Sequence, residues 1–248
     1  MSLNTILTVF AVLSGVVALF ELLEYIFTKN IPWLARLLRQ GWRRLTRQPN
    51  AAATLTPQAA RAQKSVLMGL EGRGAKAYFG IFRAALNRRL TFNARTRRPP
   101  RDPVNALLSL GYTLLTANAI TALEIVGLDP YCGFLHGLKA YGRPALALDL
   151  MEEFRPVIVD SVVLTLVNKC MATAKDFEPA RPGSGGVYLT RRGLRTFFEQ
   201  YTRRLNTTVY CPPAGRPLSY QKILEVQARR MARMIEGEVD DYTPFLVK

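Results

Sequence analysis

The sequence predicts an all-α fold, and two kinds of observation favour it. Apolar residues recur at helical spacing through residues 61–90, and two further apolar runs cover residues 102–126 and 145–174. Residues that typically begin or end helices stand at the edges of these runs. Residues 187–190 are the one stretch that suits a short strand, and they suit the lead-in to a helix equally well.

The first 50 residues differ in character from the rest of the chain. Residues 3–20 carry no charge, and a run of this length lies at the lower limit for a membrane-spanning helix. The basic flank at 36–47 would lie in the cytoplasm if that helix spanned a membrane. A buried helix, or one packed on a second subunit, explains the run equally well. We expect residues 1–50 to serve oligomerisation or membrane contact, 51–60 to be a linker, and 61–248 to form the main helical domain.

The charge and the cysteine content indicate which kind of binding partner and which cellular compartment to expect. The chain has a net charge of +16, which favours a polyanionic partner such as nucleic acid or an anionic membrane surface. An apolar content of 49% argues against a disordered chain. The three cysteines, Cys132, Cys170 and Cys211, are widely spaced and form neither a metal-binding pair nor a disulfide framework. This usage suits the reducing cytoplasm.

Within the main domain, a basic loop follows the first helical stretch. Residues 88–101 are rich in arginine and contain two adjacent prolines that stiffen the chain. The guanidinium group binds phosphate through a planar pair of donors, so the loop favours contact with a nucleic-acid backbone. A solvated surface loop is the alternative.

The central apolar runs have clear local boundaries. Asp102 followed by Pro103 predicts the start of a helix, and Gly127 predicts its end. The next long helix is expected over residues 145–174. Pro156 predicts a kink or a break within it, because proline lacks the amide proton that an unbroken helix needs.

Two amphipathic basic helices complete the domain. They are expected over residues 191–205 and 218–236. Thr190 and Ser219 are suitable N-caps, since their hydroxyl groups can accept hydrogen bonds from free backbone amides. Gly237 can end the second helix.

A candidate metal site follows from the distribution of acids and of the only histidine, His136. Asp149, Glu152 and Glu153 lie in a strongly apolar run, where buried carboxylates need a cation or hydrogen-bond donors. Carboxylates suit Mg²⁺ or Mn²⁺, and imidazole suits several transition ions. A surface histidine and an ordinary capped helix are the alternative.

A further acid stands out in the first helical stretch of the main domain. Glu71 is the only acid between Glu24 and Asp102, among many lysines and arginines. It can pair with Arg73 or Lys76, or it can be a metal ligand supplied by a distant helix. The residues alone leave both possibilities open.

Several long segments resemble a known family in sequence, order and spacing. The resemblance is to the catalytic domain of the CRISPR-associated spacer-acquisition integrase, and it covers about residues 61–248. The segments that carry it are LEGRGAKAYF, RDPVNALLSLGYTLL, GLDPYCGFLHGLKAYGRPALALDLMEEFRP, GVYLTRRGLRTFF, the helix containing QAR, and YTPF. Family members usually begin with a β-rich dimerisation domain, and the helical segment here suggests a compact form that lacks it. The usual dimer architecture and docking to the small ferredoxin-like partner protein are therefore in question.

The resemblance implies a role for particular residues. Glu71, His136 and Glu152 correspond to the metal ligands, and Asp149 is the nearby acid. The implied activity is insertion of short DNA fragments into a CRISPR repeat array, by attack of a 3′-hydroxyl on a phosphodiester with Mg²⁺ or Mn²⁺. From charge and sequence neighbourhood, we expect these residues to contact DNA: Arg73, Arg88, Arg89, Arg95, Arg97, Arg98, Lys139 and Arg143.

Two rival functions remain open, and one expectation concerns assembly. A casposase-like mobile-element integrase shares the implied chemistry, although such proteins are expected to carry an added DNA-binding domain. A membrane-tethered nucleic-acid-binding protein without enzymatic activity would use the apolar N-terminal segment and the arginines. Joining both ends of a DNA fragment needs two active sites, so at least a dimer is expected.

Overall fold

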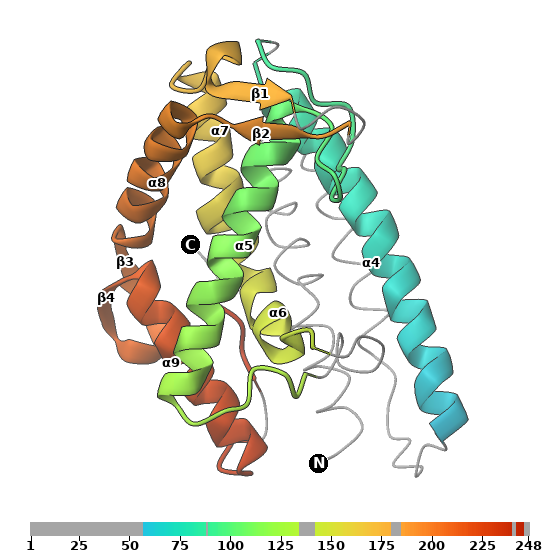
Figure 1. Cartoon of the computed structure of the whole chain (residues 1–248). Coiled ribbons are helices and arrows are strands. Elements are labelled where there is room, and N and C mark those ends of the chain that lie inside the picture. The colour runs from blue at the N-terminus through green and yellow to red at the C-terminus, as the bar shows by residue number, and fades with distance from the viewer. Residues whose placement is uncertain (1–56, 88, 134–141, 180–184, 240–241, 246–248) are drawn as a thin grey trace, which may run out of the picture.

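The computed structural model describes residues 57–87, 89–133, 142–179, 185–239 and 242–245, and Figure 1 shows their arrangement. The expected segment 1–50 lies outside the described residues. Helix α4 begins at Pro57, so the last four residues of the expected linker 51–60 belong to this helix. The division of the chain into domains stays a prediction.

The described chain is mainly helical. The principal helices are α4 (Pro57–Ala85), α5 (Pro103–Ile125), α6 (Ala145–Met151), α7 (Ser161–Asn168), α8 (Arg191–Leu205) and α9 (Tyr220–Ile235). Helix α5 runs through the middle of the fold, between α4 on one side and α8 and α9 on the other (Figure 1). The helical character of the domain is thus as the sequence predicted.

Two short antiparallel hairpins qualify the all-α prediction. Strand β1 (Phe177–Pro179) pairs with β2 (Val187–Leu189), and β3 (Thr208–Cys211) pairs with β4 (Arg216–Ser219). The possible strand at 187–190 is therefore found. The β3–β4 hairpin is not among the predicted elements, because its residues have weak strand character and its conformation depends on pairing with the partner strand.

The long helix expected over 145–174 is interrupted. After α6 the chain forms a 3-10 turn at Glu152–Phe154 and a π-helical turn at Arg155–Asp160 before it resumes as α7. Pro156 lies at the first turn of the π-helical segment and has no amide proton to donate, which explains why regular α-helical bonding is lost here. The helix then ends at Asn168 rather than at 174.

Three predicted N-caps are confirmed. The side chain of Asp102 accepts a hydrogen bond from the amide of Asn105 at 2.8 Å. Thr190 caps α8 through the amide of Gly193, and Ser219 caps α9. Gly127 and Gly237 have positive φ just after helices α5 and α9, as helix-ending glycines do.

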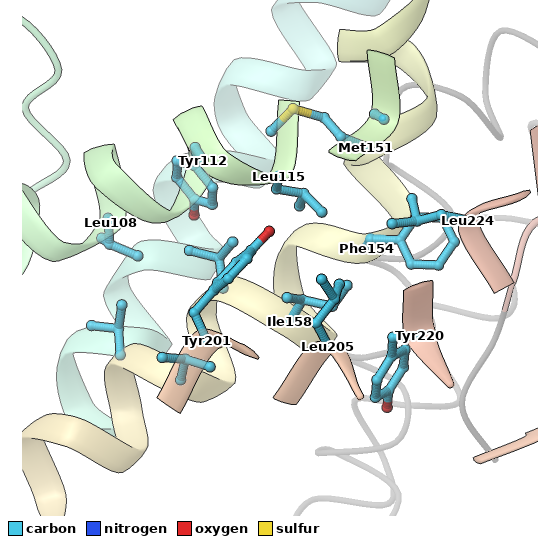
Figure 2. Packing of buried hydrophobic residues seen from close by; sticks show 14 of the residues in the cluster. Leu108, Tyr112, Leu115, Met151, Phe154, Ile158, Tyr201, Leu205, Tyr220 and Leu224 are labelled. Atoms are coloured by element: carbon cyan, nitrogen blue, oxygen red, sulfur yellow. The ribbon is translucent and has the colours of Figure 1, made fainter. Parts of the chain in front are cut away.

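The core forms around α5. Figure 2 shows side chains from α5, from the turns after α6 and from the C-terminal helices meeting in one cluster. Its largest fully buried members include Leu107, Leu115, Phe154, Phe197 and Tyr220. Of the helices in the described ranges, α5 alone has the length and apolar character to cross a membrane, and 50% of its most apolar window is buried in the fold. A central core helix has this character.

Gly111 allows α5 to approach its neighbours closely. A Cβ atom at this position would lie 2.4 Å from Val159 Cγ1 and 3.1 Å from the ring of Phe197. Both neighbours are fully buried, so they have little space to move.

We predict that Gly111→Ala lowers the free energy of unfolding by about 1–3 kcal/mol, because overpacking outweighs the better helix propensity of alanine. The matched control is Gly80→Ala in α4, where nothing lies within 4 Å of the added Cβ. That variant should be neutral, or more stable by up to about 1 kcal/mol. Urea denaturation of both variants measures the difference, and equal effects would contradict the packing argument.

Candidate metal centre and nucleic-acid interface

The break after α6 directs two adjacent carboxylates to different partners. Glu152 pairs with Arg155, whose Nη1 lies 2.5 Å and 2.6 Å from the two carboxylate oxygens. Glu153 is buried and bonds to residues of α9 and the C-terminal segment instead. The two glutamates are neighbours in sequence, but their side chains bind different partners because the backbone changes conformation here.

Arg155 holds Glu152 in a mostly buried position. The exposed fractions of the two side chains are 21% for Arg155 and 11% for Glu152. The guanidinium lies over the ring of Tyr112, 4.3 Å from its centroid. Burial opposes the charge of Arg155, but the neighbouring Glu152 and other groups keep its pKa above its ordinary value. The guanidinium therefore stays charged beside both oxygens of Glu152.

A second buried acid, Asp160, lies at the end of the π-helical turn. The hydroxyl of Tyr78 donates to Oδ2 at 2.5 Å, and that of Tyr112 donates to Oδ1 at 2.6 Å. Burial raises the pKa of Asp160 to about 6, although both hydroxyl groups and the nearby arginines act in the opposite direction. A buried carboxylate with one donor on each oxygen is well satisfied.

Glu153 fastens the C-terminal segment to the core. Tyr242 donates its hydroxyl to Oε1 at 2.5 Å, and the amide of Phe245 and the side chain of Gln227 donate to Oε2 at 2.5 Å and 3.1 Å. Phe245 also stacks on Phe154, with ring centroids 5.8 Å apart. Burial raises the pKa of Glu153 to about 7 against the effect of these three donors.

Comparison with known proteins shows the family. Residues 23–203 match the family of CRISPR associated protein Cas1. The chain belongs to this family. The match begins inside segment 1–50, so the similarity extends further towards the N-terminus than the residues quoted above suggested.

Individual relatives agree with this assignment. CRISPR-associated endonuclease Cas1 3 of Thermus thermophilus is 44% identical over 220 residues, which is 88% of this chain and 63% of the relative. CRISPR-associated endonuclease Cas1 of Leptospira interrogans is 40% identical over 185 residues, covering 73% of this chain and 71% of the relative. The chain spans less than two thirds of the first relative's length and 40% of a Cas4/Cas1 fusion from Geobacter sulfurreducens.

Solved structures share the fold. A Cas1 protein from Thermotoga maritima matches with a TM-score of 0.72 at 23% identity, over 98% of this chain and 69% of that one. A casposase bound to integration product matches with a TM-score of 0.73 at 21% identity, over 96% of this chain and 67% of that one. At such identities the likeness concerns the fold alone, so it does not distinguish a CRISPR integrase from a casposase.

The predicted metal ligands of this Cas1-family chain are only partly described. Glu71 belongs to α4, but its side chain lies outside what the structure describes, as does all of His136. Asp149 is buried near the end of α6, and Glu152 follows it on the next turn. Within the described ranges no three acids, cysteines or histidines gather as a metal site. Two carboxylates on consecutive turns do fit the oxygen ligands that Mg²⁺ and Mn²⁺ prefer.

The predicted DNA contacts divide into three groups. Arg88 and Lys139 lie outside the described residues. Five others are exposed, as a phosphate-binding role requires: Arg73, Arg89, Arg97, Arg98 and Arg143. Their contact with DNA stays a prediction.

Arg95 differs from both groups, because its guanidinium donates hydrogen bonds to other residues of the domain. It donates to Asn105 Oδ1 at 2.8 Å and to Ser109 Oγ at 3.1 Å, and it lies 5.3 Å from the centroid of the Tyr112 ring. These contacts tie the basic loop to α5. The structure thus gives Arg95 a role in positioning that loop, which sequence reasoning did not foresee, and its part in DNA binding also stays a prediction.

Sequence reasoning missed Arg155 and Asp160. Tyr78 and Tyr112 both donate hydrogen bonds to Asp160, and Tyr112 also packs in the core. One signal was available, because Asp160 is a single acid within the apolar run VIVDSVVL. An acid in such a run needs buried donors.

Glu153 leads to a pH-dependent prediction. Its pKa is about 7 in the folded protein against an ordinary value of 4.5, so the folded state binds more protons between these values. The free energy of unfolding should therefore fall as pH rises from about 4.5 to about 7, by a contribution on the order of 3 kcal/mol. Glu153→Gln should lack this contribution.

The measurement is urea denaturation of wild type and Glu153→Gln in EDTA, at several pH values from 4.5 to 8. Glu199→Gln is the control, because Glu199 is 60% exposed and pairs with Arg195 on the surface. As pH rises from 4.5 to 8, the free energy of unfolding of wild type should fall relative to that of Glu153→Gln. A difference that is constant with pH would contradict the assignment.

Proposed function

We propose that this chain is a divalent-metal-dependent DNA integrase and endonuclease that inserts short DNA fragments into a CRISPR repeat array. The observation that carries the proposal is the Cas1 family match over residues 23–203, which includes Glu71, His136 and Glu152. Relatives at 40–44% identity are named as CRISPR-associated endonucleases. The proposed reaction is attack of a DNA 3′-hydroxyl on a phosphodiester.

The proposed ligands are Glu71, His136 and Glu152, with Asp149 as the neighbouring acid. A bound Mg²⁺ or Mn²⁺ would polarise a phosphoryl oxygen and favour a deprotonated nucleophile. Glu152 is held in place by the guanidinium of Arg155, which contacts both of its oxygens. Since the DNA supplies the attacking hydroxyl, no serine or tyrosine nucleophile of the chain is needed.

The exposed arginines are proposed to hold the DNA. Arg97 and Arg98 lie in the basic loop, and Arg143 lies two residues before α6, which contains Asp149. Charge that develops on phosphate oxygens during transfer can be offset by guanidinium groups placed along the same path. These contacts give affinity and position without reading sequence.

The proposed assembly contains at least two copies of the chain, with the fragment and the CRISPR repeat or leader as DNA partners. Structures of a Cas6-RT-Cas1–Cas2 complex match this chain with a TM-score of 0.75 at 23% identity, which supports a shared fold. Docking of a small ferredoxin-like partner is a proposal by analogy with the family. Residues 1–50 are proposed to serve oligomerisation or membrane contact. The chain as a whole is proposed to be cytoplasmic.

We predict that Glu71→Ala, His136→Ala and Glu152→Ala each reduce strand transfer to background while DNA binding stays largely intact. Each change removes one ligand of the proposed ion but leaves the basic surface unchanged. The assay is transfer of a short duplex into a supercoiled plasmid with Mg²⁺ or Mn²⁺, and fluorescence anisotropy reports DNA binding. EDTA should abolish transfer by wild type.

The control for these variants is Glu199→Ala, which removes an exposed carboxylate of α8. It should retain wild-type transfer. A ligand variant that retains near wild-type activity would remove that residue from the proposed site. Membrane fractionation and activity that persists in EDTA would instead favour the non-enzymatic, membrane-tethered rival.

Asp149→Ala should lower strand transfer less than the ligand variants do, since Asp149 is proposed to lie near the ion without binding it directly. The same plasmid assay, run in parallel with Glu152→Ala, gives the comparison. Equal losses would show that Asp149 is itself a ligand.

A further inference from the structure

Helix α4 is attached to the described core through its C-terminal half. Phe82 is buried against Phe92, with ring centroids 5.6 Å apart, and Asn87 just beyond the helix donates to the carbonyl of Val167 at 2.8 Å. Among the α4 residues whose side chains the structure describes, Tyr78 is the most N-terminal with a hydrogen bond to the core. The N-terminal half of the helix stands away from α5, α8 and α9 (Figure 1).

Position 71 lies at the middle of α4, seven residues before Tyr78. At 100° and 1.5 Å per residue, seven residues make nearly two turns and about 10 Å of helix. Positions 71 and 78 thus fall on the same side of α4. A small change in the angle of the helix at Tyr78 is therefore transmitted to position 71.

The partner of Tyr78 belongs to the segment that carries Glu152. Asp160 ends the π-helical turn, and Tyr112 donates to its other oxygen. Tyr112 in turn lies under the guanidinium of Arg155, which holds Glu152. A continuous series of contacts therefore leads from α4 through Asp160, Tyr112 and Arg155 to Glu152.

We propose that Asp160 is a positioning residue of the metal centre: through the Tyr78 hydroxyl it sets the placement of α4, and with it position 71, relative to the Glu152 turn. This inference rests on the proposed function, because it assumes that positions 71 and 152 serve one site. Asp160 does not touch the ion in this proposal and acts only through α4 and Tyr112.

The chemistry of the contact suits a positioning role. A carboxylate accepts on both oxygens at once, so Asp160 can join α4 to α5 through two tyrosine hydroxyl groups. Both bonds are short, and Tyr112 is buried, so water does not readily replace them. Mutation of groups that orient metal ligands commonly lowers metal affinity by about 10- to 100-fold, and an indirect positioning residue acts on the ligands in the same sense.

A purely structural role for Asp160 makes a different prediction. In that case loss of the Tyr78 hydroxyl would cost stability much as loss of any buried hydroxyl does, and metal affinity would not change. The matched control is Tyr201→Phe, which removes a buried tyrosine hydroxyl that donates to Asn118 Oδ1 at 2.7 Å rather than to Asp160.

The test compares Tyr78→Phe with Tyr201→Phe in the full chain. Spin labels at the exposed positions Lys76 in α4 and Thr113 in α5, with Cys132 and Cys170 changed to serine, report the placement of α4 without metal. Tyr78→Phe should broaden the label distance distribution, and Tyr201→Phe should not. Calorimetric titration with Mn²⁺ alone should show affinity at least about 10-fold weaker for Tyr78→Phe only.

A second variant tests the same contact in case Tyr78→Phe does not fold. Asp160→Asn keeps the size of the side chain and should reproduce the broadening and the weaker Mn²⁺ binding. Strand transfer by both variants should recover in part at high Mn²⁺ concentration, because the proposed defect is in holding the ion.

Two results would separate failure of this inference from failure of the proposed function. If Tyr78→Phe matches Tyr201→Phe in label distances and in Mn²⁺ affinity, the positioning role is overturned even though wild type binds Mn²⁺ and transfers strands. If wild type itself binds no Mn²⁺ and transfers no strand, the proposed function and the role of Asp160 towards a metal are both overturned.

Discussion

The structure depends on the interruption of the helix after Met151. An unbroken α-helix would place Glu152 and Glu153 about 100° apart and would carry both along one regular surface. The 3-10 turn and the π-helical turn instead bring Glu152 to Arg155 and Glu153 to the donors of α9 and the C-terminal segment. One local irregularity thus gives two neighbouring acids separate tasks. Pro156 lowers the free-energy cost of this interruption, because proline has no amide proton and a regular helix would lack a hydrogen bond at this position in any case.

Buried acids connect the elements of this fold. Glu153 joins the turn to the C-terminus, and Asp160 joins α4 to α5. Asp176 joins the start of β1 to α8, where its hydrogen bonds to Arg192 lower its pKa to about 2. Removing such a carboxylate from water is costly, and the cost is offset only when several donors converge on it. Each buried acid is therefore satisfied in only one arrangement of its hydrogen-bond donors. Apolar packing alone defines the arrangement of the same elements less strictly.

The sequence allowed a good prediction of the elements and a partial one of the site. The caps Asp102, Thr190 and Ser219 and the helices that follow them were predicted within a residue or two, because capping depends on contacts only a few residues apart. The β3–β4 hairpin was missed for the opposite reason. Its residues have weak strand character, and pairing between Thr208 and Ser219 decides their conformation. Glu152 was singled out as a candidate ligand, which stays a prediction, whereas Arg155, which pairs with Glu152, was not considered.

The sequence by itself determined where helices begin and end, which residues are apolar enough to form the core, and to which family the residue pattern points. Those properties depend on local hydrogen bonding and on side-chain chemistry, both of which can be read along the chain. Tertiary structure alone decided that Tyr78 bonds to Asp160 across 82 residues, and that Glu153 reaches the amide of Phe245 across 92. Such pairs form because a buried charge must find donors wherever packing brings them, and packing depends on the whole chain at once.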